Sequence, residues 1–235
     1  MTGPQESGRF RAPAPAFLFD LDGTLVDSVY QHVTAWQEAL SACGIPLSVW
    51  RIHRRIGMSG GLFLHALQRE TGLDFDPTTL EKLSSLHAEA YLKRAKGVVP
   101  LPGARGLLRI LSINGVQFAI ATSGTHRVAA AGLGLLELPD NVPIVTRDLV
   151  ERAKPDPDLF LAAAAALGVD PAHSFVVGDS VWDLLAAQRA GALGIGLLSG
   201  GYGSEELQAA GAYRVYQDPA DLGAHLEEVG VRPAH

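Results

Sequence analysis

The chain has 235 residues, of which 47% are hydrophobic and 19% are charged, so it is unlike the polar, charge-rich chains that remain disordered. Its net charge of -6 is spread along the sequence without a long basic run, and nucleic acid is therefore not an expected partner. The single cysteine, Cys43, excludes an internal disulfide and a metal site built from several cysteines, and it fits a cytoplasmic protein. No signal-peptide core and no apolar run long enough to cross a bilayer are found, so no membrane association is expected.

Residues 1–15 are expected to form a disordered tail. Beyond them, short apolar runs recur along the chain and are separated by helical patterns. The predicted strands are 16–20, 116–123, 142–146, 174–179 and 193–198, with a candidate edge strand near 213–217. Most of these runs are continuously apolar, as expected for parallel strands covered on both faces. The sequence therefore predicts an α/β fold in which helices cover a parallel sheet.

The interval from Ser28 to Val99 contains no comparable strand. Apolar residues recur there at helical spacing, first after Ser28, a predicted helix cap, and again after Asp76 and Pro77, a favourable N-cap and first-turn pair. These residues are Val29, Val33, Trp36 and Leu40, then Leu80, Leu83, Leu86 and Ala90. We therefore expect a helical domain at 28–99, inserted into a core domain formed by 16–27 and 100–235. The alanine run at 162–166 predicts a helix that ends at Gly168.

Polar side chains follow several of the predicted strands. They are Asp20 and Asp22 after the first, Thr122 and Ser123 after the second, Lys154 in the connection after the third, and Asp179 after the fourth. In an open parallel sheet, ligands bind beyond the carboxyl ends of the strands. Clustered carboxylates require a compensating cation or lysine, and their hard oxygen atoms suit Mg²⁺. The sequence therefore predicts a Mg²⁺ site that includes Asp20 and Asp179.

Such a group of side chains can transfer a phosphoryl group. Asp20 is predicted to attack phosphorus as a nucleophile, and Asp22 to act as general acid and then as general base. The other predicted phosphate contacts are the Thr122 hydroxyl, the Lys154 ammonium and backbone amides around Gly23, Ser123 and Gly124. Asp183, one helical turn beyond Asp179, is expected to support either the metal site or Lys154.

The segments DLDGT, IATS, KPDPD and GDSVWD occur in the order and spacing of the four motifs of the haloacid dehalogenase-like superfamily, which the chain resembles over nearly its whole length. The resemblance implies a Rossmann-like core with Asp20 as nucleophile and Asp22 as acid and base. It also implies Mg²⁺ held by Asp20, the backbone carbonyl of Asp22, and Asp179. The helical insertion is similar to the mobile cap of the subfamily that includes phosphoglycolate phosphatases and β-phosphoglucomutases.

Several cap residues are candidates for substrate contact. Ser59 lies in GMSGG, residues 57–61, which is expected to form a cap loop that lowers small groups toward the substrate. Because no strand precedes it, the similar serine-hydrolase elbow is not expected there. Arg55 or Arg54 is a candidate for binding an anionic substrate tail, although a solvated basic face is an equal alternative. His32 shares a helix face with Trp36 and is open to either a binding or a core role. Asp27 is expected to be structural, and 200–203 to form a loop near the site.

The function predicted from these features is Mg²⁺-dependent hydrolysis of a small phosphomonoester, of the phosphoglycolate or sugar phosphate type, through an aspartyl phosphate. The alternative is a phosphosugar mutase of the β-phosphoglucomutase kind, because the segment DSVYQHVTAW resembles the first cap helix of such mutases. Gly60 and Gly178 depart from the mutase pattern. Three other functions are not expected. A receiver-type signalling domain would be shorter than this chain, and a haloacid dehalogenase does not use the second aspartate, which is present here as Asp22. A catalytically silent binding module would have lost at least one catalytic group, and none is missing. The expected partner is a small phosphorylated molecule, and the protein is expected to be a monomer or a homodimer.

Overall fold

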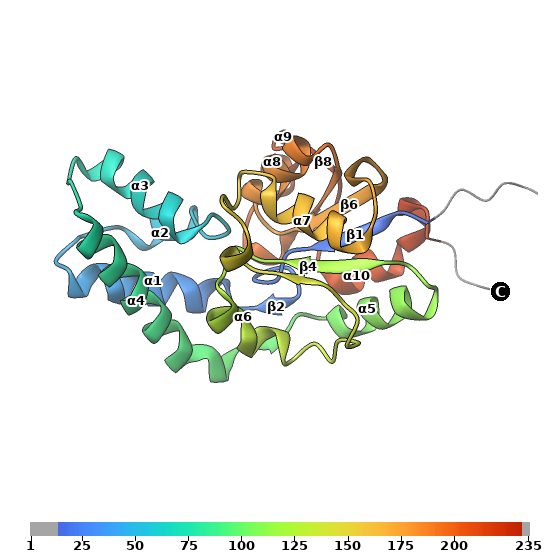
Figure 1. The fold of residues 1–235 in the computed structure, drawn as a ribbon, viewed down its shortest axis with the longest axis horizontal. Helices are drawn as coiled ribbons and strands as arrows, with labels where there is room; N and C mark the ends of the chain where they lie inside the picture. The colour runs from blue at the N-terminus through green and yellow to red at the C-terminus, as the bar shows by residue number, and fades with distance from the viewer. Residues whose placement is uncertain (1–13, 232–235) are drawn as a thin grey trace, which may run out of the picture.

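The computed structural model describes residues 14–231, so the predicted tail lies outside the described residues except for Ala14 and Pro15. A layered α/β core carries a group of helices that projects from one end of the sheet (Figure 1). This arrangement confirms the predicted fold class, a Rossmann-like parallel-sheet core with an inserted helical cap. No helix among the described residues is both long and apolar enough to cross a membrane.

The core sheet has six parallel strands in the order β5-β4-β1-β6-β7-β8. They are β1 (Ala16–Phe19), β4 (Phe118–Ala121), β5 (Ile144–Val145), β6 (Ser174–Gly178), β7 (Leu193–Leu197) and β8 (Ala212–Tyr216). All six predicted strands are confirmed, although each is shorter than the apolar run that predicted it or is shifted by a residue. Strand β1 is buried on both faces, because Phe17 and Phe19 pack into one hydrophobic cluster and Leu18 into the other.

Helices cover both faces of this sheet (Figure 1). On one face lie α5 (Ala104–Ile113), α6 (His126–Leu133) and α10 (Pro219–Ala224); on the other lie α7 (Asp158–Leu167), α8 (Val181–Ala190) and α9 (Ser204–Ala209). Short 3₁₀ turns complete the connections at η1 (Ala95–Gly97), η2 (Arg147–Leu149), η3 (Pro171–His173), η4 (Leu198–Gly200) and η5 (Leu226–Val229). Helix α7 ends at Gly168, whose φ of 69° is left-handed, as the sequence predicts.

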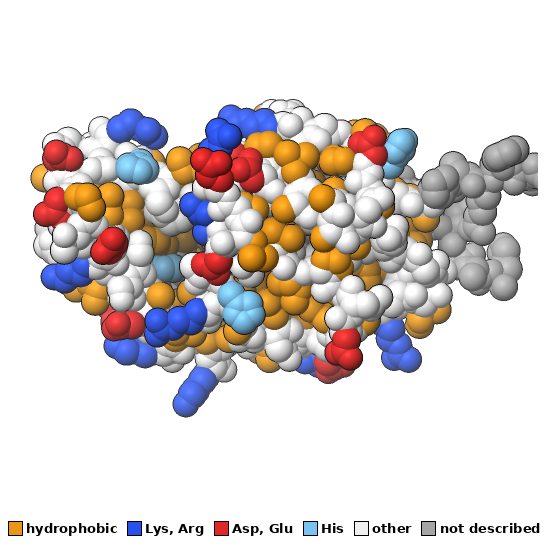
Figure 2. Space-filling view, viewed as in Figure 1, with side chains coloured by type: hydrophobic (Ala, Val, Ile, Leu, Met, Phe, Trp, Pro, Cys, Tyr) orange, Lys and Arg blue, Asp and Glu red, His pale blue; other side chains and the backbone are white. Residues whose placement is uncertain are grey.

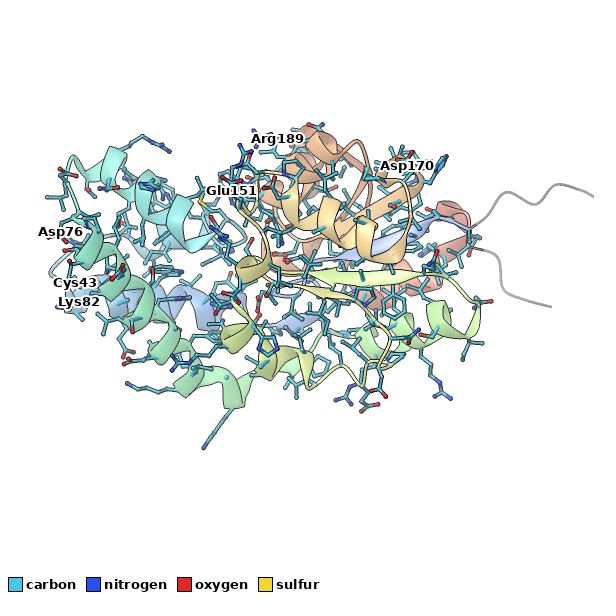
Figure 3. The ribbon with its side chains drawn as sticks, in the orientation of Figure 1. Cys43, Asp76, Lys82, Glu151, Asp170 and Arg189 are labelled. Carbon is cyan, nitrogen blue, oxygen red and sulfur yellow. The ribbon has the colours of Figure 1, made fainter. Side chains whose placement is uncertain are left out.

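The cap consists of α1 (Val29–Ala42), α2 (Val49–His53), α3 (Gly60–Thr71) and α4 (Pro77–Arg94), packed around a hydrophobic cluster of their own. The Asp76 side chain accepts a hydrogen bond from the Thr79 backbone N–H, and Pro77 opens α4, as predicted. The prediction for Ser28 is wrong in one respect. It lies at the N-cap of α1, but its side chain makes no capping bond and its hydroxyl donates to Asp22 instead. Cys43 lies at the outer end of the cap, away from the core (Figure 3).

Two short strands join the cap to the core. Strands β2 (Val26–Asp27) and β3 (Val99–Pro100) pair in an antiparallel ribbon, with Val26 opposite Pro100. Neither was predicted, because two residues are too few to produce a periodic pattern. Asp27 is exposed on β2 and lies in the connection, in line with the structural role expected for it. The division of the chain at 28 and 99 stays a prediction, and it falls in this ribbon.

Candidate active site

The chemical groups of the candidate site meet at the carboxyl ends of three adjacent strands. Asp20 follows β1, Thr122 follows β4 and Asp179 follows β6, and β1 lies between the other two in the sheet. All three side chains are buried. Parallel strands end at the same edge of a sheet, so residues far apart in the sequence converge there.

Lys154 is fully buried and connects two of the carboxylates. Its ammonium forms ion pairs with Asp20 and, at 2.8 Å, with Asp183. The other oxygen of Asp183 accepts hydrogen bonds from the backbone N–H of Ser180, at 3.1 Å, and from its hydroxyl, at 2.5 Å. This capping box at the start of α8 fixes the Asp183 carboxylate. The sequence left the role of Asp183 open, and the structure places its carboxylate on Lys154.

Burial sets the charge state of this cluster. Burial raises the pKa of Asp20 to about 7. Lys154 opposes this rise, and the negative charges of Asp183 and Asp22 add to it. Burial likewise raises the pKa of Asp179 well above its usual range, with further contributions from Asp183 and Asp20. Burial disfavours the charged form of Lys154 as well, but the two carboxylates outweigh it and raise the pKa of the ammonium. The carboxylates therefore outnumber the positive charge that stabilises them.

This shortage of positive charge fits a metal ion. Asp20, Asp179 and Asp183 each offer an oxygen atom within 4.8 Å of the others, and all three residues are buried. Carboxylate oxygens are the preferred ligands of hard divalent cations. Asp179 is held in place by Thr24, whose hydroxyl donates to it at 3.0 Å. The donor set and the raised pKa values therefore suit a divalent cation. The contact of Thr24 with Asp179 was not predicted from the sequence.

Asp22 lies on the cap side of the cluster and contacts histidine. Its Oδ1 is 3.2 Å from His32 Nε2 and accepts a hydrogen bond from Ser28. Burial opposes ionisation of Asp22, but His32 and Ser28 outweigh it and lower the pKa of this carboxyl. His32 Nδ1 lies 3.1 Å from His87 Nε2 on α4, and burial and His32 lower the pKa of His87 well below its usual range. A chain of polar contacts thus runs from Asp22 through His32 to the neutral His87.

A cavity of about 260 Å³ lies between the cap and these core residues. Figure 2 shows a hollow between the cap and the sheet, with charged side chains around it. Of the predicted site residues, the cavity is lined by Asp20, Asp22, Thr122, Ser123, Gly124, Lys154, His32 and Arg55. The cap also contributes an apolar wall that includes Trp36, Met58 and Phe63. The structure therefore brings core and cap candidates to one space.

Other predicted residues lie outside the cavity wall. The Ser59 hydroxyl accepts a hydrogen bond from the Leu62 backbone N–H and caps α3, so the serine is buried and held by its own helix. Gly23 has a φ of 80°, and a Cβ there would lie 2.5 Å from Asp179 Oδ2. Glycine therefore allows the loop after Asp22 to pass close to the Asp179 carboxylate. Asp179 and Asp183 lie in the buried cluster and do not line the cavity.

Cap residues next to the cavity also bind the core. The Arg54 side chain pairs with Glu206. The Arg54 backbone carbonyl accepts hydrogen bonds from the Tyr202 hydroxyl, at 2.9 Å, and the Trp182 indole N–H, at 3.3 Å. A ring nitrogen of His53 lies 2.8 Å from the carbonyl oxygen of Gly200, so the 200–203 loop lies beside the site as expected. Arg54 is therefore a cap-to-core contact and does not face the cavity. The aromatic partners on the core carry no sequence pattern that marks them.

Comparison with known proteins agrees with this arrangement. The family described as haloacid dehalogenase-like hydrolase matches residues 14–191. The crystal structure of a hydrolase from Pseudomonas syringae has a TM-score of 0.90 and 53% sequence identity, over 92% of this chain and 100% of that one. Phosphoglycolate phosphatase from Rhodospirillum rubrum is 31% identical over 93% of this chain and 96% of its own length. Hexitol phosphatase A from Escherichia coli is 36% identical over 74% of this chain and 79% of its own. The chain belongs to the family of haloacid dehalogenase-like hydrolases.

Proposed function

We propose that the protein is a Mg²⁺-dependent phosphatase that hydrolyses a small phosphomonoester through an aspartyl phosphate on Asp20. The observation that carries the proposal is the position of Asp20 at the cavity, paired with buried Lys154 and close to Asp22. Asp20 and Asp179, with the backbone carbonyl of Asp22, would hold Mg²⁺, which supplies positive charge to the carboxylates and to the phosphoryl group. The single cysteine and the small cavity fit a cytoplasmic enzyme of small metabolites, acting as a monomer or a homodimer.

In the first step, an oxygen of Asp20 attacks phosphorus, and the bond from phosphorus to the ester oxygen breaks. The leaving oxygen takes a proton from Asp22. His32 lowers the pKa of Asp22, and the charge of a bound phosphate group would raise it again. Thr122, Lys154 and residues 123–124 line the cavity, and the hydroxyl, the ammonium and the backbone amides would hold the phosphoryl oxygens as charge moves between them.

In the second step, water attacks the phosphorus atom of the aspartyl phosphate. Asp22 takes a proton from this water, and the bond between Asp20 and phosphorus breaks, which releases inorganic phosphate and restores both carboxyl groups. Cap contacts such as those of His53 and Arg54 with the core enclose the cavity during the first transfer.

The phosphosugar mutase is the alternative function, and the structure offers no observation that favours it. Gly178 stands where mutases carry an acidic metal ligand. A Cβ at Gly178 would overlap the Cβ and Cγ of Asp183. An acidic side chain at position 178 would displace Asp183 from Lys154, so the pair of Asp183 and Lys154 requires a glycine there.

The test is phosphate release from a panel of small phosphomonoesters that includes phosphoglycolate and sugar phosphates, with Mg²⁺ and with chelator. We expect release that requires Mg²⁺ and is abolished by Asp20→Asn. Asp27→Asn is the matched control, since Asp27 is exposed near the same loop and does not line the cavity. Absence of release from every compound by folded, Mg²⁺-bound protein would refute the proposal. Interconversion of glucose 1-phosphate and glucose 6-phosphate would favour the mutase.

A further inference from the structure

The cationic side chains of the cavity differ in what they already bind. Lys154 is paired with Asp20 and Asp183. The Arg55 guanidinium pairs with Glu70 and also donates to the Arg51 carbonyl, at 2.8 Å. Their charges are thus neutralised within the protein.

Arg147 also lines the cavity, but it has no carboxylate partner among the described residues. One of its five N–H donors is used, in a 2.6 Å hydrogen bond from Nη1 to the Val150 carbonyl. The neighbouring acid, Asp148, forms no ion pair with Arg147; its Oδ2 accepts hydrogen bonds from the His126 backbone N–H and the Thr146 hydroxyl. Arg147 therefore presents uncompensated positive charge to the cavity.

The backbone holds Arg147 at a defined place. Its N–H donates to the carbonyl of Gly124 at 3.0 Å, which ties η2 to the loop that follows Thr122. Strand β5, which precedes Arg147, is two positions from β1 in the sheet. The strand register brings Asp20 level with Val145, two residues before Arg147. Because neighbouring strands lie about 4.8 Å apart, the backbones of Asp20 and Val145 are separated by roughly 10 Å. Arg147 and Asp20 line the same cavity, and a substrate of a few carbon atoms would reach from one to the other.

We propose that Arg147 binds a carboxylate on the substrate, so that the preferred substrates are phosphorylated hydroxy acids. The inference rests on the proposed phosphatase function and assigns the residue that selects its substrates. A planar guanidinium matches a carboxylate with two parallel hydrogen bonds. Trp36, Met58 and Phe63 form the apolar part of the cap wall, where the hydroxyl groups of a sugar would lose hydrogen bonds to water; the polar part of that wall includes Ser84 and His87.

From the sequence, Arg55 or Arg54 was a candidate for binding an anionic substrate tail, with a solvated basic face as an equal alternative. Arg54 pairs with Glu206 on the core, and Arg55 pairs with Glu70 within the cap. In this inference the carboxylate contacts Arg147, which belongs to the core. The binding role of Arg55, which also lines the cavity, stays a prediction.

The experiment compares 3-phosphoglycerate with glycerol 3-phosphate, which carries a hydroxymethyl group in place of the carboxylate. Values of kcat/KM are measured with Mg²⁺ for the wild type, Arg147→Gln, Arg147→Lys and Arg152→Gln. Arg152 is a matched control, because it lies on the same connection, its side chain is 66% exposed and it does not line the cavity.

We expect the wild type to prefer 3-phosphoglycerate, and Arg147→Gln to reduce that preference roughly 10- to 100-fold, mainly through KM, as for loss of a charge-assisted hydrogen bond. Arg147→Lys should recover part of the preference and Arg152→Gln should keep all of it. Equal use of the two esters by the wild type would overturn the inference. So would an equal loss on both esters in Arg147→Gln, which would indicate a structural role.

Calorimetric binding to Asp20→Asn, which lacks the nucleophile, separates the inference from the proposed function. We expect 3-phosphoglycerate to bind Asp20→Asn more tightly than Asp20→Asn/Arg147→Gln. That result without any hydrolysis by the wild type would refute the phosphatase and support the role of Arg147. Equal binding to both variants would overturn the role of Arg147, whatever the activity.

Discussion

Lys154→Met tests whether one buried ammonium holds the acidic cluster together. Methionine keeps an unbranched apolar stem and lacks the ammonium group. Lys154 is fully buried, and its partners Asp20 and Asp183 are nearly so, with side-chain exposures of 3% and 0%. Removing one member of a buried ion pair leaves the other charge uncompensated, at a cost of about 3 to 5 kcal/mol. We expect the variant to lose that amount of unfolding free energy in the presence of chelator.

The loss should also depend on pH. Burial raises the pKa of Asp20 from 3.8 to about 7, so the folded protein keeps a proton that the unfolded chain releases, and stability falls as pH rises through this window. Lys154 lowers the pKa of Asp20, so its removal extends the window upward. Above pH 7 the gap between variant and wild type should widen by about 1.4 kcal/mol per pH unit for this one carboxyl.

The assay is urea unfolding followed by circular dichroism at pH 6 and pH 8.5, with chelator present. Lys82→Met is the matched control, because Lys82 is an exposed lysine on the outer end of the cap (Figure 3). A substitution of that kind should change the unfolding free energy by less than about 0.5 kcal/mol. Equal, small losses for the two variants at both pH values would refute the claim that Lys154 compensates the carboxylates.

Three further predictions concern the same region. In Gly200→Ala the new Cβ would overlap Asp179 Oδ2, so Mg²⁺ affinity measured by calorimetry should fall by roughly tenfold or more; unchanged affinity would exclude Asp179 as a ligand. Gly106→Ala is its control, since a Cβ on that helical residue meets nothing within 4 Å, and it should raise the unfolding free energy by about 0.5 kcal/mol. Arg54→Gln should cost no more than about 1 kcal/mol of unfolding free energy, because Arg54 and Glu206 are 36% and 44% exposed; a loss of several kcal/mol would contradict this. Mg²⁺ at 100 times its Kd should raise the unfolding free energy by about 2.7 kcal/mol. The same melting temperature with Mg²⁺ and with chelator would contradict a metal site in the folded state.

The core could be predicted from sequence because its signals are local. Continuous apolar runs such as Phe17 to Phe19 predict strands buried on both faces, and Asp20 stands directly after one of them. Parallel strands then end at a common edge, so the convergence of Asp20, Thr122 and Asp179 follows from the topology.

The cap side of the site could not be predicted in the same way. His87 lies 55 residues from His32, and only the packing of α4 against α1 brings the two rings together. Helical periodicity gives the faces of each helix but not which faces meet. Ser59 illustrates a local competition: the sequence predicts it in a loop that lowers small groups and backbone amides toward the substrate, and its hydroxyl accepts a hydrogen bond from a backbone N–H at the start of its own helix. Arg147 follows a strand of only two residues, where no pattern marks a binding role.

The ribbon of β2 and β3 has a consequence for how substrate preference can change. The helical segment leaves the core at Val26 and returns at Pro100, and these residues are paired neighbours. A segment whose two ends meet can be replaced by another of different length without spreading the core, because the entry and exit points stay where they are. Proteins with this core can therefore exchange the helical segment as a unit during evolution, while the pairs of Lys154 with Asp20 and Asp183, which lie within the core, are kept.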